Sequence, residues 1–118
     1  MPSLRTPEGK RRYQEYLSAN PATGSCALCE KVALKEFEYW KIIENSFPYD
    51  LIAQTHHMIA PLRHVNEAGL NVEERAGLSS IKADVIDKEY DYVVETTSKN
   101  RSIPEHFHLH LLIGIRSK

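Results

Sequence analysis

The chain of 118 residues has only two cysteines, two methionines and one tryptophan. It also lacks any apolar stretch near the roughly 18 residues that a membrane-spanning helix requires. Its 15 basic and 16 acidic residues give a formal net charge of −1, so the sequence gives no sign of the broad basic surface that binds nucleic acids or membranes. What is left is an ordinary globular composition, with a hydrophobic fraction of 42%.

The first residues, MPSLRTPEGKRRYQEYL, do not contain the apolar core of a secretory signal. We therefore expect a cytoplasmic location, in which thiols stay reduced. The two cysteines, Cys26 and Cys29 in the segment SCALCE, are spaced as Cys-x-x-Cys. In a reducing compartment this spacing is more typical of a metal or redox pair than of a structural disulfide.

Hydrophobic periodicity predicts helices and strands in an order that defines the fold class. The expected elements are a helix (7–18), a loop (20–25), two strands (37–45 and 55–62), a long helix (71–90) and two more strands (90–96 and 106–115). Asn71 is expected to cap the long helix, and Glu74 to complete a capping box. Two antiparallel strand pairs on either side of one helix predict an α+β domain with the helices on one face of the sheet.

The segment HFHLHLL, residues 106–112, places three histidines at alternate positions. Because alternate side chains of a strand share a face, His106, His108 and His110 are expected on one side and the apolar residues between them in the core. Imidazole is a good zinc or copper ligand, and its pKa lies near neutrality. The row therefore suits either metal binding or catalysis.

The same segment resembles the signature of the histidine triad family, in which three histidines alternate with apolar residues and two apolar residues follow. THHMIAPLRHV, residues 55–65, is similar to a second landmark of that family, a strand that ends in Pro-x-x-His. CALC is similar to the cysteine pair of many members, and NSFPYD resembles a loop of the branch with galactose-1-phosphate uridylyltransferases and dinucleotide phosphorylases. The resemblance implies a histidine triad domain over residues 25–118, with residues 1–24 as an N-terminal helix and loop extension.

For the activity, the resemblance implies a nucleotide hydrolase that attacks an α-phosphorus, with a nucleoside phosphoramidate or dinucleoside polyphosphate as substrate. His108 would be the nucleophile that forms a covalent nucleotidyl-histidine, and His110 would bind phosphate oxygens. Two alternatives stay open, a nucleotidyltransferase or phosphorylase of the same superfamily and a catalytically idle nucleotide-binding module. The resemblance also implies a two-fold homodimer, formed through the long helix and an edge strand.

The segment before the triad departs from the family's pattern. Hydrolases of the family commonly have a Gly-rich segment with Gln-Ser there, whose hydroxyl helps to protonate the leaving group. This chain has SKNRSIPE, which puts Ile103 at the serine position and Ser102 one position away. Ser102 is therefore the candidate acid and Asn100 a candidate phosphate contact, while Asn45 and Phe47 are candidates for binding the ribose and base.

Cys26 and Cys29 have the spacing of half a zinc site, and tetrahedral Zn²⁺ needs two further ligands. In zinc-bearing members of the family these are the histidine after the second strand and the first triad histidine, here His64 and His106. The adjacent histidines 56–57 compete for the third ligand position, although alternation lets only one of them point inward.

Overall fold

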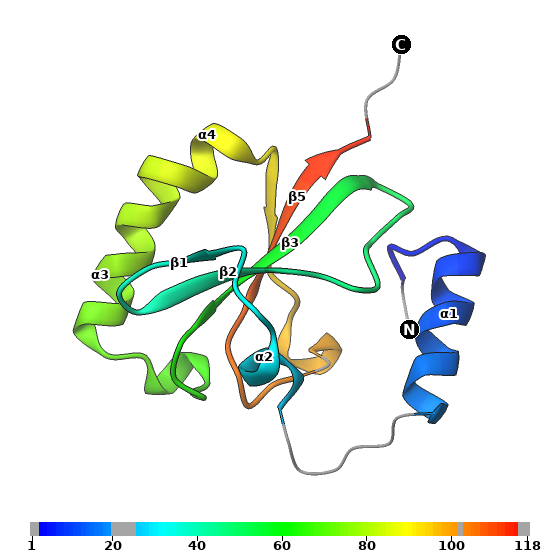
Figure 1. The fold of residues 1–118 in the computed structure, drawn as a ribbon, viewed down its shortest axis with the longest axis horizontal. Coiled ribbons are helices and arrows are strands. Elements are labelled where there is room, and N and C mark those ends of the chain that lie inside the picture. The colour runs from blue at the N-terminus through cyan, green and yellow to red at the C-terminus, as the bar shows by residue number, and fades with distance from the viewer. Residues whose placement is uncertain (1–2, 20–25, 102, 116–118) are drawn as a thin grey trace.

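The computed structural model describes residues 3–19, 26–101 and 103–115, and its centre is a five-stranded antiparallel sheet (Figure 1). The strands are β1 (Lys35–Glu36), β2 (Trp40–Glu44), β3 (Ala53–Pro61), β4 (Tyr92–Val94) and β5 (Leu109–Gly114). They lie in the order β1-β2-β3-β5-β4, and every neighbouring pair is antiparallel. The predicted α+β class is confirmed, although β1 was not predicted.

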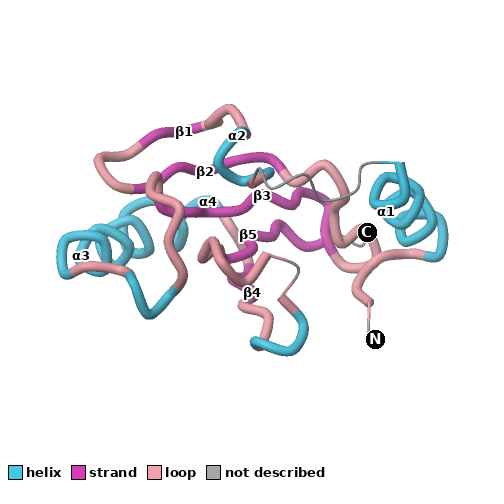
Figure 2. The backbone as a smooth tube through the Cα atoms, turned by 90° about the horizontal axis from the view of Figure 1, so that it is seen from below, coloured by secondary structure: helices cyan, strands magenta, loops and turns pink. Residues whose placement is uncertain are grey.

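The helices flank this sheet. They are α1 (Pro7–Ala19), the short α2 (Ala27–Glu30), and a long helix made of α3 (Val72–Ile81), a π-helical turn (Lys82–Ile86) and α4 (Asp87–Glu89). The long helix and α1 lie on opposite sides of the sheet, and not on one face as the sequence predicts (Figure 1 and Figure 2). Within the described residues, no helix has the length and apolar character needed to cross a membrane.

The long helix begins as its sequence predicts. The Asn71 side chain accepts from the backbone N–H of Glu74 (2.8 Å), and the Glu74 carboxylate accepts from the backbone N–H of Asn71 (2.9 Å), which completes a capping box. Arg63 also donates to both carboxylate oxygens of Glu74. The capping box thus gives hydrogen-bond acceptors to two backbone N–H groups at the helix start, those of Asn71 and Glu74, which would otherwise be unpaired.

The main core lies between the sheet and the long helix. Trp40 of β2 is fully buried, and its indole N–H donates to the Glu74 carbonyl (2.8 Å), which joins β2 to α3. Phe107, Leu109 and Leu111 belong to the same cluster, as the expected alternation requires. The opposite side of this segment is thus left for the histidines.

The last strand is shorter than the predicted range 106–115, because β5 begins at Leu109. The backbone N–H of Phe107 donates to the carbonyl of Val65 (2.8 Å), in the loop after β3. This bond takes the backbone out of the sheet ladder while the side chains keep alternating. The loop predicted over residues 20–25 lies outside the described residues, and the division of the chain at residue 25 stays a prediction.

Candidate active site and metal cluster

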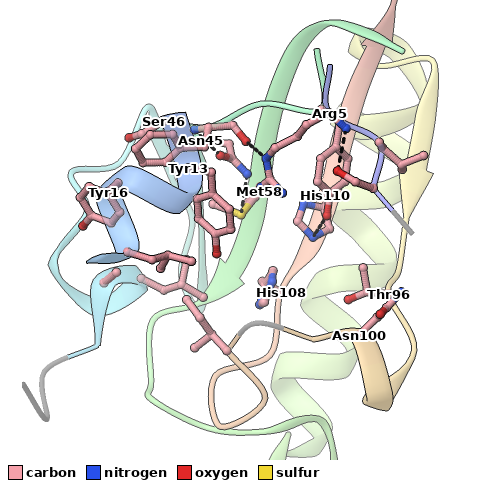
Figure 3. A pocket seen from close by; sticks show the side chains of 18 of the residues that line it. Arg5, Tyr13, Tyr16, Asn45, Ser46, Met58, Thr96, Asn100, His108 and His110 are labelled. Atoms are coloured by element: carbon pink, nitrogen blue, oxygen red, sulfur yellow. Dashed lines mark hydrogen bonds between the residues drawn. The ribbon is translucent and has the colours of Figure 1, made fainter. Parts of the chain in front are cut away.

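A cavity of about 680 Å³ borders the histidine side of the sheet (Figure 3). The sequence candidates that line it are Asn45, Phe47, Asn100, His108 and His110. Tyr13 and Tyr16 stand on one side and Asn100 on the opposite side, with His108 between them (Figure 3). Ser102, the candidate leaving-group acid, lies outside the described residues.

The proton position on His108 follows from its backbone contact. Its Nδ1 lies 3.0 Å from the carbonyl oxygen of His106, and because a carbonyl oxygen can only accept, Nδ1 must carry the proton. Burial lowers the pKa of His108 below its ordinary value, which favours the neutral ring. The neutral ring then has its lone pair on Nε2, the form that a nucleophilic imidazole needs.

His110 has its proton position set by a second histidine, His56 of β3, to which the sequence analysis gave no catalytic role. The backbone N–H of Tyr49 donates to Nδ1 of His56 (2.9 Å), so the proton of a neutral His56 is on Nε2. That Nε2 lies 2.7 Å from Nδ1 of His110. Nδ1 of His110 therefore accepts, and its Nε2 carries a proton, 3.3 Å from the Tyr49 hydroxyl oxygen.

Both histidines of this pair are neutral at ordinary pH. Burial is the main cause that lowers the pKa of His56 and of His110 to about 3, and neighbouring cations and histidines add to it. In this cavity, His108 therefore has the nucleophilic tautomer with a free Nε2, and His110 presents an N–H donor. Their ring centroids are 5.2 Å apart, which is close enough for both to contact one phosphate group.

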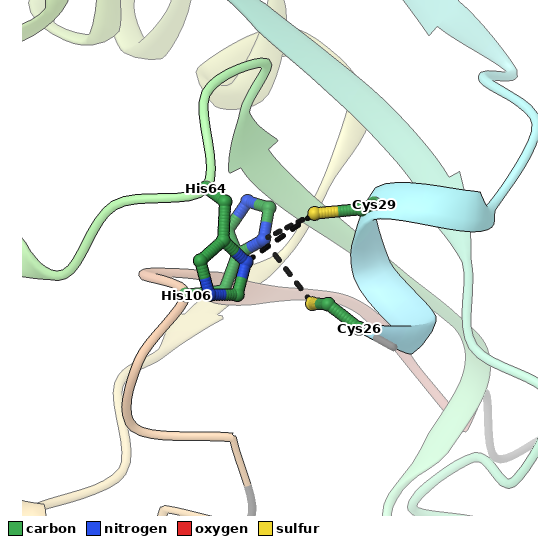
Figure 4. Close-up of side chains that lie close together, drawn as sticks. All are labelled: Cys26, Cys29, His64 and His106. Atoms are coloured by element: carbon green, nitrogen blue, oxygen red, sulfur yellow. Dashed lines mark hydrogen bonds between the residues drawn. The ribbon is translucent and has the colours of Figure 1, made fainter. Parts of the chain in front are cut away.

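Cys26, Cys29, His64 and His106 gather beside α2, and their ligand atoms all lie within 4.8 Å of one another (Figure 4). The Sγ atoms of Cys26 and Cys29 are each 3.4 Å from Nδ1 of His106, and Sγ of Cys29 is 3.3 Å from Nδ1 of His64. Nε2 of His106 donates to the Pro61 carbonyl (3.0 Å), which leaves the Nδ1 lone pair for a metal. Two thiols and two imidazoles fit a tetrahedral ion, so this cluster can hold a metal.

The structure separates the two histidines that competed with His64. His56 points toward the cavity and bonds to His110. Nδ1 of His57 lies 2.6 Å from the hydroxyl oxygen of Tyr90, at the end of the long helix. His64 is therefore the histidine that joins the cysteine pair, as the family resemblance implied.

The N-terminal segment forms a wall of the cavity that the sequence analysis missed. The rings of Tyr13 and Tyr16 in α1 have centroids 5.4 and 4.9 Å from that of Phe47. Arg5 donates from Nε to the Phe47 carbonyl (2.9 Å). The i,i+3 spacing of the two tyrosines in a charged helix was the available signal, because it puts both on one face.

Hydrogen bonds to the loop after β2 hold this N-terminal segment in place. Thr6 donates from its backbone N–H and its hydroxyl to the two carboxylate oxygens of Asp50 (2.7 and 2.8 Å). These bonds lower the pKa of Asp50, so the carboxylate is ionised near neutral pH. Leu51 also donates its backbone N–H to the Leu4 carbonyl (3.1 Å).

Searches with family models and among curated proteins gave no match to this chain. Solved structures do match. A HIT (histidine triad) family hydrolase from Clostridium thermocellum shares 20% identity at a TM-score of 0.56, with 82% of this chain and 96% of that one covered. A HIT family hydrolase from Legionella pneumophila shares 18% at a TM-score of 0.55 (80% and 96% covered), and a histidine triad protein from Clostridium difficile shares 15% at 0.56 (82% and 96% covered). The chain therefore has the fold of the histidine triad proteins.

Proposed function

We propose that this chain is a nucleotide-binding hydrolase that attacks an α-phosphorus through His108. The observation that carries the proposal is the pair of fixed tautomers in one cavity, a free Nε2 on His108 beside an N–H on His110. The hydrolase names of two structural neighbours support the same reaction class.

In the first step, Nε2 of His108 attacks the α-phosphorus and the bond from phosphorus to the leaving group breaks. The leaving group takes the electron pair and a proton, for which Ser102 stays our candidate donor. The His106 carbonyl, which accepts from Nδ1 of His108, stabilises the positive charge that develops on the ring. The N–H of His110 donates to a non-bridging phosphate oxygen. Water then attacks phosphorus, and the bond from phosphorus to Nε2 breaks with its electron pair returning to His108, which becomes neutral again. The nucleoside monophosphate is released, and the proton that water loses replaces the one given by the candidate acid Ser102.

We propose a nucleoside phosphoramidate or a dinucleoside polyphosphate as substrate. The aromatic wall of Phe47, Tyr13 and Tyr16 suits a nucleobase, because flat rings stack on one another. The Asn45 carbonyl oxygen accepts from the backbone N–H of Phe47 (2.8 Å), and its amide nitrogen lies 3.3 Å from Nε2 of His56 and 3.7 Å from Sδ of Met58. These contacts hold the amide at the cavity wall, where it is a candidate to bind a ribose hydroxyl. Asn100, across the cavity, remains a candidate phosphate contact.

We also propose that the cysteine–histidine cluster binds Zn²⁺ with a structural role. Four protein ligands close a tetrahedral coordination sphere, so the ion would stabilise the link between α2 and the triad segment. The free state of Cys26 and Cys29 fits a reducing, cytoplasmic location.

A homodimer through the long helix and the edge strand β4 completes the proposal, and sedimentation velocity tests it.

The deciding experiment is release of AMP from adenosine 5′-phosphoramidate by the wild-type chain, His108→Ala and the control His57→Ala. We expect His108→Ala to lose about 1,000-fold or more in kcat, as removal of a nucleophile does, and His57→Ala to keep its turnover. Equal turnover in wild type and His108→Ala would refute the mechanism. AMP release that requires an added phosphate or sugar phosphate would indicate the transferase. AMP binding without turnover in the wild type and in both variants would indicate the idle nucleotide-binding module.

A further inference from the structure

Arg5 brings a cation from the N-terminal segment to the wall of the cavity. Its guanidinium carbon lies 4.2 Å from the Tyr13 ring centroid and 5.0 Å from that of Tyr49. Tyr49 in turn contacts His110, with its hydroxyl 3.3 Å from Nε2 and the ring centroids 4.9 Å apart. Tyr49 thus contacts both the guanidinium and the imidazole, and Arg5 and His110 line the same cavity (Figure 3).

The charges around this cavity are of one sign. Its described lining residues include Arg5 and Lys31 but neither an aspartate nor a glutamate. The ammonium of Lys31 already donates to the Glu44 carbonyl (2.8 Å) and to the Ser46 hydroxyl (2.6 Å). A positive lining without a carboxylate attracts anions, although the whole chain has a formal net charge of −1.

Arg5 is held in place without being neutralised. The Arg5 side chain donates through Nε to a backbone carbonyl, that of Phe47. Among the described residues, Arg11, Arg12, Arg63 and Arg101 each lie within ion-pair distance of a carboxylate, whereas Arg5 does not. An oriented guanidinium without a carboxylate partner is well suited to a phosphate, which it can bind through two parallel N–H groups.

We infer that Arg5 is a phosphate-binding residue of this cavity, so that the N-terminal extension supplies a charge which neither the sheet nor the triad provides. His110 cannot replace it, because burial lowers the pKa of His110 to about 3 and keeps its ring neutral. The inference rests on the proposed function for the identity of the ligand, a nucleotide that carries its phosphate beside His110.

The test compares binding of AMP and of adenosine, by calorimetry at low ionic strength, in the full chain and three variants. Arg5→Gln removes the charge, Arg5→Lys keeps it, and Lys10→Gln removes a charge from an exposed position of α1 that does not line the cavity. We expect Arg5→Gln to weaken AMP binding about tenfold, as loss of one charge-assisted hydrogen bond would, with adenosine unaffected. Arg5→Lys keeps the charge but not the two parallel N–H groups, so it should restore only part of that loss. Lys10→Gln should match the wild type.

Other results overturn the inference. Equal weakening of AMP and adenosine binding by Arg5→Gln would indicate that Arg5 only positions the wall. Unchanged AMP binding in Arg5→Gln would exclude any contact with phosphate.

A further measurement separates this inference from the proposed function. Inorganic phosphate is titrated while the imidazole ¹⁵N signals of His110 are followed in wild type and Arg5→Gln. Signals that respond to phosphate only when Arg5 is present would uphold the inference even if no nucleotide were bound or hydrolysed. The opposite result is turnover that depends on His108 while the His110 signals either do not respond to phosphate or respond equally in wild type and Arg5→Gln. This result would uphold the function and refute the inference.

Discussion

At the scale of single residues, the position of one proton on each ring decides what the cavity can do. The N–H of Tyr49 sets the tautomer of His56, and His56 sets that of His110. His108 is set separately, by the His106 carbonyl. The nucleophile and the phosphate donor are therefore prepared by different contacts, and a change at His56 should affect the donor and not the nucleophile.

We expect His56→Leu to lower kcat toward the phosphoramidate by up to about 100-fold, as loss of one oriented donor to a developing charge does. Without His56, Nδ1 of His110 loses its fixed donor and the ring can protonate at either nitrogen. His56→Gln should recover part of the rate, because its amide can accept from Tyr49 and donate to His110. Kinetics of both variants beside His57→Leu would check this, and a His56→Leu enzyme with wild-type kcat would show that His110 needs no such positioning.

At the scale of elements, the docking of α1 depends on a glycine. A Cβ atom on Gly9 would lie 2.6 Å from Oδ2 of Asp50, the carboxylate that accepts both Thr6 bonds. The Thr6 contacts and a side chain at position 9 therefore exclude each other. Gly77 in α3 offers a matched comparison, since a Cβ there would be 3.5 Å from Trp40, an ordinary contact.

We expect Gly77→Ala to stabilise the chain by about 0.5–1 kcal/mol, the usual gain of alanine over glycine inside a helix. Gly9→Ala should instead destabilise it by about 1 kcal/mol, because the loss of hydrogen bonds to Asp50 outweighs that gain. Urea unfolding measures both values. Gly9→Ala should also weaken AMP binding, since α1 lines the cavity, and a stabilised variant with normal AMP affinity would contradict the docking.

The short helix α2 links the cysteine–histidine cluster, our candidate metal site, to the cavity. Ala27 and Leu28, which line the cavity, lie between Cys26 and Cys29. We expect about one zinc per chain in the wild type and in His57→Gln, and much less in Cys26→Ser. Chelation should lower the free energy of unfolding by about 3 kcal/mol, since a site filled at 100 times its Kd contributes roughly that amount. Metal content and urea unfolding give the measurements, and equal zinc in wild type and Cys26→Ser would exclude the site.

The sequence was sufficient where the contacts are local. The capping box at Asn71, the alternation of the triad and the spacing of the two cysteines each depend on residues within a few positions. The role of His56 could not be predicted, because it depends on the register of β3 against β5, which pairs Met58 with His110. The wall formed by α1 depends likewise on contacts between residues some 40 positions apart along the chain, such as Thr6 with Asp50.

At the scale of the whole molecule, the buried histidines couple stability to pH. A free histidine has a pKa of about 6.5, whereas burial lowers the pKa of His56 and of His110 to about 3. Between these values the unfolded chain binds protons that the folded chain does not. Stability must therefore fall as pH decreases from about 6.5 toward 3. The carboxylates of Asp50 and Glu74, whose pKa values are lowered by hydrogen bonds to Thr6 and Arg63, add to this loss only below about pH 4, where free carboxylates begin to bind protons.

We expect each of these two histidines to lower the free energy of unfolding by about 2 kcal/mol when the pH falls from 7 to 5. The reason is that a histidine of the unfolded chain is almost fully protonated at pH 5, whereas the buried one is not. His56→Gln has no proton to bind at this position, so its stability should fall by about 2 kcal/mol less than that of the wild type. Urea unfolding at both pH values gives the difference. Both proteins contain the same cysteine cluster, so any loss of metal at pH 5 affects them alike. An identical pH dependence would mean that His56 titrates normally in the folded chain, and the tautomer assigned to His110 would then lose its support.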